Sequence, residues 1–510
     1  MASKQQSGPK SVFKSLGFQA TLQKLCAEVQ ELYLADSVPW VVGYSGGKDS
    51  TATLQLIWIA LAELQPDQHH KPVHVISTDT LVENPIVAKW VEHSLEQVNK
   101  AARAKSMPFQ AHRLIPQVQD SFWVNLIGKG YPAPSPMFRW CTSRMKINPS
   151  NRFISDVVRS NGEAIVVLGT RKAESSRRAA TMKKHEKHRV RDKLSPNGSL
   201  PNSLIYSPVE DWENDDVWTY LMQVKNPWGY NNKDLLTMYQ GASEDGECPL
   251  VVDTTTPSCG KSRFGCWVCT LVSEDKSMTA MIKNDHEKSW MQPLLDIRNE
   301  LATKDRSKRD FRRMSGQVQI FKGEPIPGPY KQQAREEWLR KLLVAETWIR
   351  KNGPKEVRDL ELITMPELHE IRRTWVIDKN EVEDSLPQIY ASAKGEPFPS
   401  RPLHEHSCFG AEEIDLLRTL CDEDTIHFEL IRELIAVEER HRHMAKRSGL
   451  FQALEKALRR GFYTDAEDAK QRALLRKSAN KDRIPKDERR GIKPKPTPQL
   501  FDASSQEVAK

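Results

Sequence analysis

Short apolar runs alternate with amphipathic stretches through the first half of the chain. Four of these runs predict buried strands, at residues 38–42, 73–80, 110–115 and 164–168. Apolar residues recur at helical spacing over residues 18–32, 50–64 and 85–106. Strands that alternate with helices are typical of α/β proteins. We therefore expect an open, mostly parallel sheet with helices on both faces.

Beyond residue 278 the pattern changes to charged helices with apolar positions at i, i+3, i+4 and i+7. Between the two halves lies a short segment rich in cysteine. The predicted organisation is a disordered N-terminus at 1–15, an α/β domain at 16–235, a Cys-rich segment at 236–275, a helical basic region at 276–350, a helical C-terminal domain at 351–476 and a disordered basic tail at 477–510.

Charge and cysteine content narrow the class of protein. Lys and Arg number 76 against 68 Asp and Glu, which gives a formal net charge of +8. This excess is compatible with a polyanionic partner but does not require one. No apolar run approaches the roughly 20 residues of a membrane helix, and the first residues lack the apolar core of a signal peptide. We expect a cytoplasmic protein. Its eight cysteines are too few for a disulfide framework, and their clustering points to metal binding instead.

A glycine-rich loop, YSGGKDST at residues 44–51, connects the first predicted strand to a helix. Glycines allow backbone N–H groups to converge on an anion, and the helix N-terminus adds positive potential. Ser45, Lys48 and Ser50 supply further donors. The spacing differs from that of the P-loop of hydrolytic NTPases. The loop therefore predicts a phosphate site of another kind, the alternative being a purely structural turn.

The S-G-G-x-D-S spacing resembles the signature of the PP-loop ATP pyrophosphatases. Members of that family split ATP between the α and β phosphates: an acceptor oxygen is adenylylated, pyrophosphate leaves, and a nucleophile displaces AMP. The resemblance implies that the pyrophosphate is held by Ser45, Gly46, Gly47, Lys48 and Ser50. It also implies that Asp49 and Asp79 organise Mg²⁺ or ribose. For Asp79, at the end of the second predicted strand, a helix N-cap or turn is the alternative.

Cys141 lies in an unusual stretch, with Arg139, Arg144 and Lys146 as its neighbours in sequence. Positive charge near a thiol lowers its pKa and favours the thiolate, which is the form that acts as a nucleophile or metal ligand. The sequence therefore predicts a reactive cysteine here, with a buried structural cysteine as the alternative.

Three further motifs follow the loop in order: C-x-x-x-x-K-x-x-P at residues 141–149, G-x-R-x-x-E-S-x-x-R at 169–178 and W-x-x-x-D-V-W at 212–218. Together they resemble the phosphoadenylylsulfate-reductase-like branch of the PP-loop family. The resemblance implies that Gly169 and Arg171 contact ATP and that Arg144, Lys146 and Arg178 bind the substrate phosphate. Surface salt bridges are the alternative for the arginines. The basic run at 181–193 predicts an exposed loop.

Four cysteines, Cys248, Cys259, Cys266 and Cys269, have spacings that allow them to converge on one metal centre. Structural zinc commonly uses two C-x-x-C pairs, whereas only one pair is so close here. The spacing therefore favours a [4Fe–4S] cluster over zinc. Cys141 is either a persulfide carrier, which we favour, or a cluster ligand in place of Cys248.

The segments at residues 139–149, 247–269 and 328–343 (RWCTSRMKINP, ECPLVVDTTTPSCGKSRFGCWVC and GPYKQQAREEWLRKLL) together resemble the DNA phosphorothioation sulfurtransferases. The resemblance implies an enzyme that adenylylates a backbone phosphate oxygen and enables its replacement by sulfur. Its catalytic residues would be Lys48, Asp49, Cys141 and Arg171. Its cofactors would be ATP, Mg²⁺ and the cluster, and its partners DNA, a cysteine desulfurase as sulfur donor and other phosphorothioation proteins.

Two other functions remain open at this stage. One is a PP-loop tRNA thiolase, which also joins adenylylation to an iron–sulfur cluster. The other is a nucleotide-binding scaffold without catalysis in a DNA-modification complex. We favour the sulfurtransferase over both. The substrate class would separate it from the thiolase, and the effect of replacing Lys48 and Cys141 would separate it from the scaffold.

Overall fold

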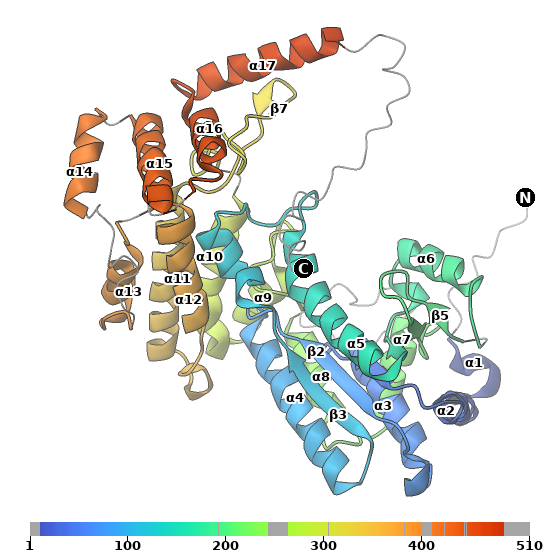
Figure 1. Ribbon diagram of the computed structural model, residues 1–510. Coiled ribbons are helices and arrows are strands. Elements are labelled where there is room, and N and C mark those ends of the chain that lie inside the picture. Colours follow the sequence, from blue (N-terminus) through green and yellow to red (C-terminus); the bar gives the residue numbers. More distant parts are fainter. Residues whose placement is uncertain are drawn as a thin grey trace, which may run out of the picture. The chain divides into compact units, whose positions relative to one another are not determined.

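The computed structural model describes residues 11–191, 193–242, 264–303, 305–381, 383–399, 411–422, 424–442, 444 and 446–483. Strand β1 (Trp40–Gly43) pairs with parallel strands on both sides. It belongs to a six-stranded sheet of order β3-β2-β1-β4-β6-β5, in which only β5 runs antiparallel (Figure 1). The other strands are β2 (Val73–Thr78), β3 (Phe109–Leu114), β4 (Ala164–Val167), β5 (Ser195–Pro196) and β6 (Ser203–Tyr206).

Both faces of this sheet are buried, because alternate residues of β1 enter two different cores. Trp40 and Val42 pack on one side and Val41 on the other. The first core receives side chains from α2 (Phe18–Leu34), α3 (Lys48–Ala62), α4 (Pro85–Ala104), α7 (Asn214–Gln223) and α8 (Asn232–Gly241). The second receives side chains from α5 (Asn148–Asn161). The predicted α/β fold, with its helical C-terminal region, is confirmed.

The remaining elements are mainly helical. The remaining α-helices and strands are α1 (Phe13–Leu16), α6 (Ser176–Glu186), α9 (Lys276–Asn284), α10 (Gln292–Ala302), β7 (Ile320–Phe321), β8 (Glu324–Pro325), α11 (Gln332–Asn352), α12 (Met365–Arg373), α13 (Leu386–Lys394), α14 (Ala411–Leu420), α15 (Thr425–Arg442), α16 (Leu450–Gly461) and α17 (Ala466–Arg483). Short 3₁₀ or π turns are η1 (Pro66–Gln68), η2 (Val118–Asp120), η3 (Val124–Gly128), η4 (Thr142–Ile147), η5 (Lys172–Glu174), η6 (His286–Met291), η7 (Lys355–Val357) and η8 (Thr374–Asp378). Among the helices that the structure describes, none is both long enough and apolar enough to cross a bilayer.

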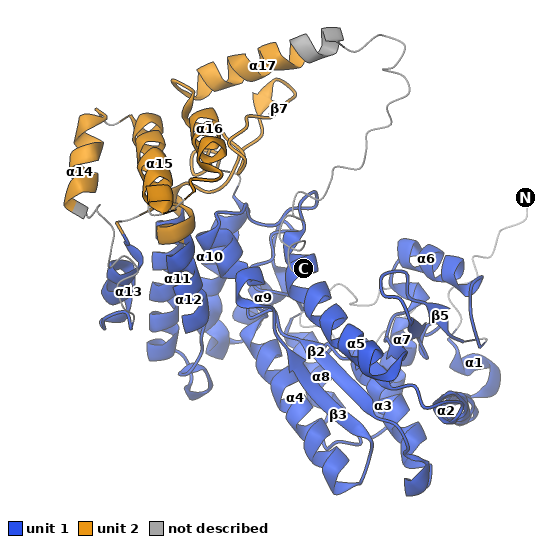
Figure 2. Cartoon of the chain, viewed as in Figure 1, with its two compact units in different colours: residues 1–304, 335–374, 384–402 blue, residues 305–334, 375–383, 403–510 orange. Residues whose placement is uncertain are grey.

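The chain divides into two compact units (Figure 2). The first contains the sheet and comprises residues 1–304, 335–374 and 384–402; the second comprises 305–334, 375–383 and 403–510. In the second unit, Arg312 is buried and forms ion pairs with Asp310 (2.9 Å) and Glu429 (2.5 Å). Arg309 donates to the carbonyl of Gly328 (2.6 Å). Two arginines of the predicted basic region at 276–350 therefore make contacts that stabilise the interior of this unit.

Three segments differ from the sequence-based expectations. Phe13 lies in α1, within the predicted disordered N-terminus, because its ring packs on Trp212 (5.5 Å between centroids). The basic run expected as a loop is helical through Glu186, since the Ser175 hydroxyl caps the first turn of α6. Helix α17 continues past residue 477 to Arg483. Residues 1–10 and 484–510, where disorder is predicted, lie outside the described residues.

A pair of histidines lies beneath α5. The rings of His74 on β2 and His112 on β3 are diagonal neighbours, with Nδ1 and Nε2 3.2 Å apart, and both contact Phe153. Burial, and secondarily His112, lowers the pKa of His74 to about 4. Burial also lowers the pKa of His112. An unfolded histidine titrates near 6.5, so the unfolded state binds more protons between about pH 4 and 6.5.

We expect the free energy of unfolding to fall as the pH is lowered through that window. His74→Gln should reduce the loss, because it removes one of the two groups that must stay neutral. Thermal melting at pH 7 and pH 5 measures the effect, with the exposed His93→Gln as the matched control. Equal losses of melting temperature in the wild type and His74→Gln would contradict the assignment.

Candidate functional site

The order of the strands creates a topological switch point between β1 and β4. The chain passes from β1 to β2 on one side and reaches β4 on the other. Loops at such a point diverge, and ligands bind between them at the carboxyl ends of the strands. The glycine-rich loop follows β1, and Gly169 with Arg171 follows β4. The structure therefore brings these two sequence motifs together.

The glycine-rich loop is tightly held from α4. Gly46 has φ of +71°, and a Cβ there would lie 2.4 Å from Cγ2 of Val91. Trp90 Nε1 donates to the carbonyl of Gly46 (3.2 Å). These contacts fix the loop so that α3 begins at Lys48. A glycine-rich turn followed by the N-terminus of a long helix presents backbone N–H groups to an anion.

The serines of the loop bond to one another across the turn. The hydroxyls of Ser45 and Ser50 lie 3.1 Å apart, and the Ser50 hydroxyl donates to the carbonyl of Gly47 (3.0 Å). On another side, the Tyr239 hydroxyl lies 3.4 Å from the backbone nitrogen of Lys48. The predicted pyrophosphate-binding residues thus form one continuous group at the start of α3.

Asp49 is held between two cations. Its carboxylate accepts from Nε of Arg171 (2.7 Å) and pairs with Nζ of Lys48 (3.1 Å). Arg171 is only 4% exposed, and it also donates to the carbonyl of Trp212 (3.0 Å). The capping Glu174 accepts from the Arg171 backbone nitrogen (3.0 Å). Arg171 therefore holds Asp49 from inside the protein, and Lys48 lies on the outer side.

Gly169 allows the loop after β4 to approach the first turn of α3 closely. A Cβ at Gly169 would lie 2.7 Å from the backbone oxygen of Asp49 and 2.9 Å from Oγ1 of Thr53. The Thr53 hydroxyl itself donates to that same Asp49 oxygen (2.9 Å). Only glycine fits at this position without moving the first turn of α3.

Asp79 lies at the carboxyl end of β2, next to the loop. Its carboxylate accepts from the backbone nitrogen of Leu81 (2.8 Å) and from Nε of Arg113 (3.0 Å). It therefore stabilises a turn and an ion pair in the structure. The backbone nitrogen of Tyr44 donates to Ile76 of the same strand (2.8 Å), so the ends of β1 and β2 are neighbours.

A second group of residues gathers just beyond β2. Cys266 pairs with Glu83 through an isolated bridge, and its sulfur lies 3.3 Å from Oγ1 of Thr80. The backbone nitrogen of Cys269 donates to the carbonyl of Cys266 (3.0 Å), as expected for a tight C-x-x-C turn. The fully buried Arg298 donates to the carbonyl of Cys269 (3.0 Å) and so anchors this turn.

Cys141 lies close enough to Cys269 for the two thiols to influence each other. Burial, and to a smaller degree Cys269, raises the pKa of Cys141. This differs from the sequence-based expectation of a lowered pKa. The physical reason is burial, which disfavours the charged thiolate. The nearby cations have carboxylate partners of their own, since Arg144 pairs with Asp120 and Lys146 with Glu83 (3.1 Å).

The third predicted substrate-binding cation is also paired. Arg178 forms an ion pair with Glu174 one turn earlier in the chain. Both side chains are partly exposed, and ion pairs at such positions are generally weak. A phosphate could compete for such a cation more easily than for the buried Arg171. Arg171 is therefore the buried cation of the site, whereas the three predicted substrate-binding cations are partly exposed.

The predicted metal centre is described only in part. Cys266 and Cys269 lie at the carboxyl end of β2, whereas Cys248 and Cys259 lie outside the described residues. Within the described ranges, no three His, Cys, Asp or Glu side chains are arranged to bind a metal ion. Two neighbouring, partly buried thiols suit a thiolate-bound metal group chemically. The four-cysteine assignment stays a prediction.

Sequence reasoning missed the residues that hold the site from behind. Trp90 and Tyr239 clamp the glycine-rich loop, and the Tyr239 ring stacks edge-on against Phe264 (4.8 Å) near the C-x-x-C turn. Arg298 was missed as well. All three lie in amphipathic helices, where an aromatic or charged residue looks like an ordinary core or surface position.

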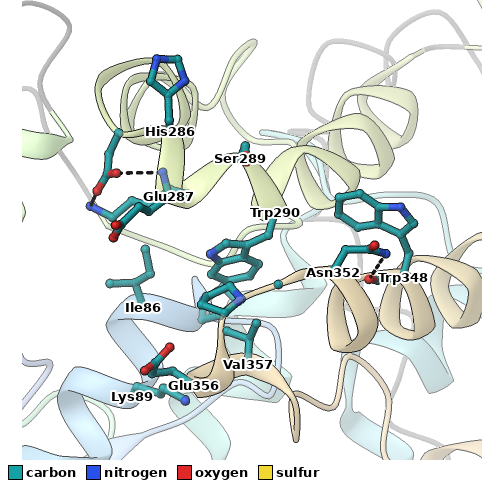
Figure 3. A pocket seen from close by; sticks show the side chains of 15 residues that line it. Ile86, Lys89, His286, Glu287, Ser289, Trp290, Trp348, Asn352, Glu356 and Val357 are labelled. Carbon is teal, nitrogen blue, oxygen red and sulfur yellow. Dashed lines mark hydrogen bonds and ion pairs between the residues drawn. The ribbon is translucent and has the colours of Figure 1, made fainter.

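A cavity of about 730 Å³ lies elsewhere in the same unit (Figure 3). The start of α4, η6 and the end of α11 with η7 line it. Its charged side chains have mixed sign, and Lys288 already pairs with Asp285 (3.1 Å). No predicted site residue borders it. The cavity therefore lacks the convergent positive charge that a phosphate site needs.

Gly169→Ala should strongly reduce nucleotide binding, because the added methyl group overlaps the backbone of Asp49. The expected loss is tenfold or more in ATP affinity, with a destabilisation of about 1–3 kcal/mol from overpacking. Isothermal titration with a non-hydrolysable ATP analogue measures the first and thermal melting the second. Gly198→Ala is the matched control, since nothing lies within 4 Å of its Cβ position. An unchanged ATP affinity in Gly169→Ala would refute the requirement for glycine at this position.

The comparisons with known proteins agree with this geometry. The chain is 27% identical over 200 residues, 39% of its length, to an uncharacterized protein of Methanocaldococcus jannaschii. The match covers 35% of that relative, so the chain spans about a third of its length. A family model described as the phosphoadenosine phosphosulfate reductase domain matches residues 39–271. The part of the chain from β1 to just beyond the C-x-x-C turn is therefore similar to a phosphoadenosine phosphosulfate reductase domain.

Proposed function

We propose that this protein is an ATP-dependent sulfurtransferase of DNA phosphorothioation, of the DndC type. It adenylylates an oxygen of a backbone phosphate, releases pyrophosphate, and enables the replacement of that oxygen by sulfur. The observation that supports this best is the presence of two chemistries at one edge of the sheet. The phosphate-type loop follows β1, and cysteine thiols lie beyond β2. Neighbouring strands are roughly 4.8 Å apart, so both sites can act on one substrate.

The first step is the activation of an oxygen that is otherwise a very poor leaving group. The phosphate oxygen attacks the α-phosphorus of ATP, and the bond to the β-phosphate oxygen breaks as the new P–O bond forms. Negative charge accumulates on the departing pyrophosphate. The N–H groups at the start of α3 and the Lys48 ammonium are positioned to stabilise that charge. The released fragment is pyrophosphate, and the substrate phosphate then has AMP attached.

Arg171 acts through Asp49 in this proposal. Its buried guanidinium fixes the carboxylate, and the carboxylate in turn orients Lys48 toward the loop. Asp49 with Asp79 supplies oxygen ligands of the kind that Mg²⁺ prefers. Arg144, Lys146 and Arg178 are accessible cations that could exchange their carboxylate partners for the phosphates of the substrate.

The second step delivers sulfur. The terminal sulfur of a persulfide on Cys141 attacks the activated phosphorus, and AMP leaves with the original oxygen. An external thiol then attacks the Cys141 sulfur, which breaks the S–S bond, releases the phosphorothioate and leaves a mixed disulfide on Cys141. A second external thiol resolves that mixed disulfide, so the two external thiols are oxidised to a disulfide and the Cys141 thiol is restored. A cysteine desulfurase would supply the persulfide sulfur. Other phosphorothioation proteins would select the DNA site.

The Cys266–Cys269 turn fits a thiolate-bound group, because both thiols belong to one tight turn anchored by Arg298. With Cys248 and Cys259 these residues would hold a [4Fe–4S] cluster. When bound, such a cluster supplies electron transfer or a binding position for sulfur. The residues of this chain orient and shield it, with Trp267 buried directly beside Cys266.

Lys48→Ala should lower pyrophosphate release from ATP by about 100-fold, because it removes a cation from the departing group. The assay uses anaerobically purified protein with DNA, and mass spectrometry of nuclease-digested DNA detects phosphorothioate linkages. Lys24→Ala, on the exposed side of α2, is the control. Pyrophosphate release stimulated by tRNA and not by DNA would favour a thiolase. Retained DNA modification in Lys48→Ala and in Cys141→Ser would favour a scaffold.

Cys266→Ser should reduce bound iron and acid-labile sulfide to below about half of the wild-type content, because a cluster that loses a thiolate is destabilised. Elemental analysis and the visible absorption spectrum measure this without any activity assay. Cys421→Ser is the control, since Cys421 is a buried cysteine of the second unit. Zinc in place of iron in the wild type would overturn the cluster assignment.

A further inference from the structure

An exposed tip precedes Cys141 directly in the chain. Residues 135–138 form a tight turn closed by two backbone hydrogen bonds between Ser135 and Phe138 (3.2 and 2.9 Å). At its apex Met137 is 96% exposed, and the neighbouring Phe138 is 36% exposed. Arg139 follows and is exposed as well. The turn therefore presents two large apolar side chains and a cation to solvent.

The base of this tip is rigid. Trp140 is buried, and its Nε1 donates to the carbonyl of Pro132 (2.9 Å). The Thr270 hydroxyl donates to the carbonyl of Pro134 (2.6 Å), which ties the tip to the segment immediately after Cys269. Contacts on both sides of the turn therefore fix the tip beside the thiol site. Phe138 packs partly on Tyr131 (6.2 Å between ring centroids), whereas Met137 buries almost no surface, so packing does not explain an apolar residue at position 137.

We propose that the Pro136–Met137–Phe138 apex is a wedge that inserts between base steps of duplex DNA beside the thiol site. This rests on the proposed function. Proline, methionine and phenylalanine are among the side chains that proteins insert at kinked steps, with arginine on the adjacent backbone or groove. Unstacking costs a few kcal/mol, and the bend increases the area of contact. Here the kink turns a backbone phosphate toward the thiols.

The shape of the tip favours DNA over a protein partner. A stable protein interface buries roughly 800 Å² on each side, whereas a wedge needs only the apex of one turn. The exposed cation Arg139 and the net charge of +8 suit a polyanion. An inserted side chain must also be held in place, as the contacts of Trp140 and Thr270 ensure.

A wedge predicts a preference for DNA that is already weakened. The full-length protein is titrated with a labelled short duplex and with the same duplex carrying one mismatch, and fluorescence anisotropy gives both affinities. The wild type should bind the mismatched duplex about fivefold or more tightly, because unstacking costs less there. The double variant Met137→Ala/Phe138→Ala should bind the two duplexes equally. Thermal melting checks that it folds.

Two single variants separate the wedge from general effects. Arg139→Ala should weaken both duplexes alike and reduce the salt dependence by about one phosphate contact. Leu34→Ala, an exposed apolar residue at the end of α2, should behave as the wild type. A mismatch preference that survives in the double variant would overturn the wedge. The wedge would also be overturned if the double variant lost binding to the cysteine desulfurase but kept the mismatch preference, since the tip would then bind a protein.

The failure of the wedge is distinguishable from the failure of the proposed function. The proposed function depends on phosphorothioate formation by the wild type, and the wedge on the mismatch preference of wild type against variant. Wild-type protein that modifies DNA but shows no such preference removes the wedge alone. A preference for mismatched RNA duplexes over DNA would overturn the wedge as stated.

Discussion

The contact between Asp49 and Arg171 is the constraint on which the site depends. A guanidinium that is 4% exposed has lost most of its hydration, and such a charge is tolerable only with a hydrogen-bonded anionic partner. Asp49 is that partner, and it belongs to the first turn of the helix that follows the glycine-rich loop. The ion pair therefore joins the loop after β1 to the loop after β4. Because Gly169 has no side chain, the two loops can be this close.

Carboxylates also pair with the other cations around the site, but these pairs are less buried than the pair of Asp49 and Arg171. Asp120, Glu83 and Glu174 each hold one basic side chain at partly exposed positions. Lys146 and Arg178 are the more exposed of these cations, and exposed ion pairs contribute little to stability, so their partners mainly keep them oriented. The arrangement combines one permanent buried pair with several exchangeable ones. A polyanionic substrate meets cations whose positions are already set.

The fold was largely predictable, because strand burial and helical periodicity are local properties of residues such as Val41 and Leu54. The motif residues that follow β1 and β4 could also be placed, since parallel strands bring their carboxyl ends together. What the sequence could not reveal were contacts between distant residues. The clamp by Tyr239 depends on helix packing, and the raised pKa of Cys141 depends on its burial in the folded chain. Helix α6 was missed because its stability comes from a cap and not from an apolar face.

The two units are interwoven along the chain, since residues 305–334 belong to the second unit and 335–374 to the first. No single cut can separate them into two intact pieces. A protein shortened after residue 402 keeps 305–334 but loses α15, and with it Glu429, one of the two acidic partners of the buried Arg312. The remaining segment would contain an arginine whose desolvation is only partly compensated. Domain dissection of this protein must therefore remove internal segments as well as its C-terminal part.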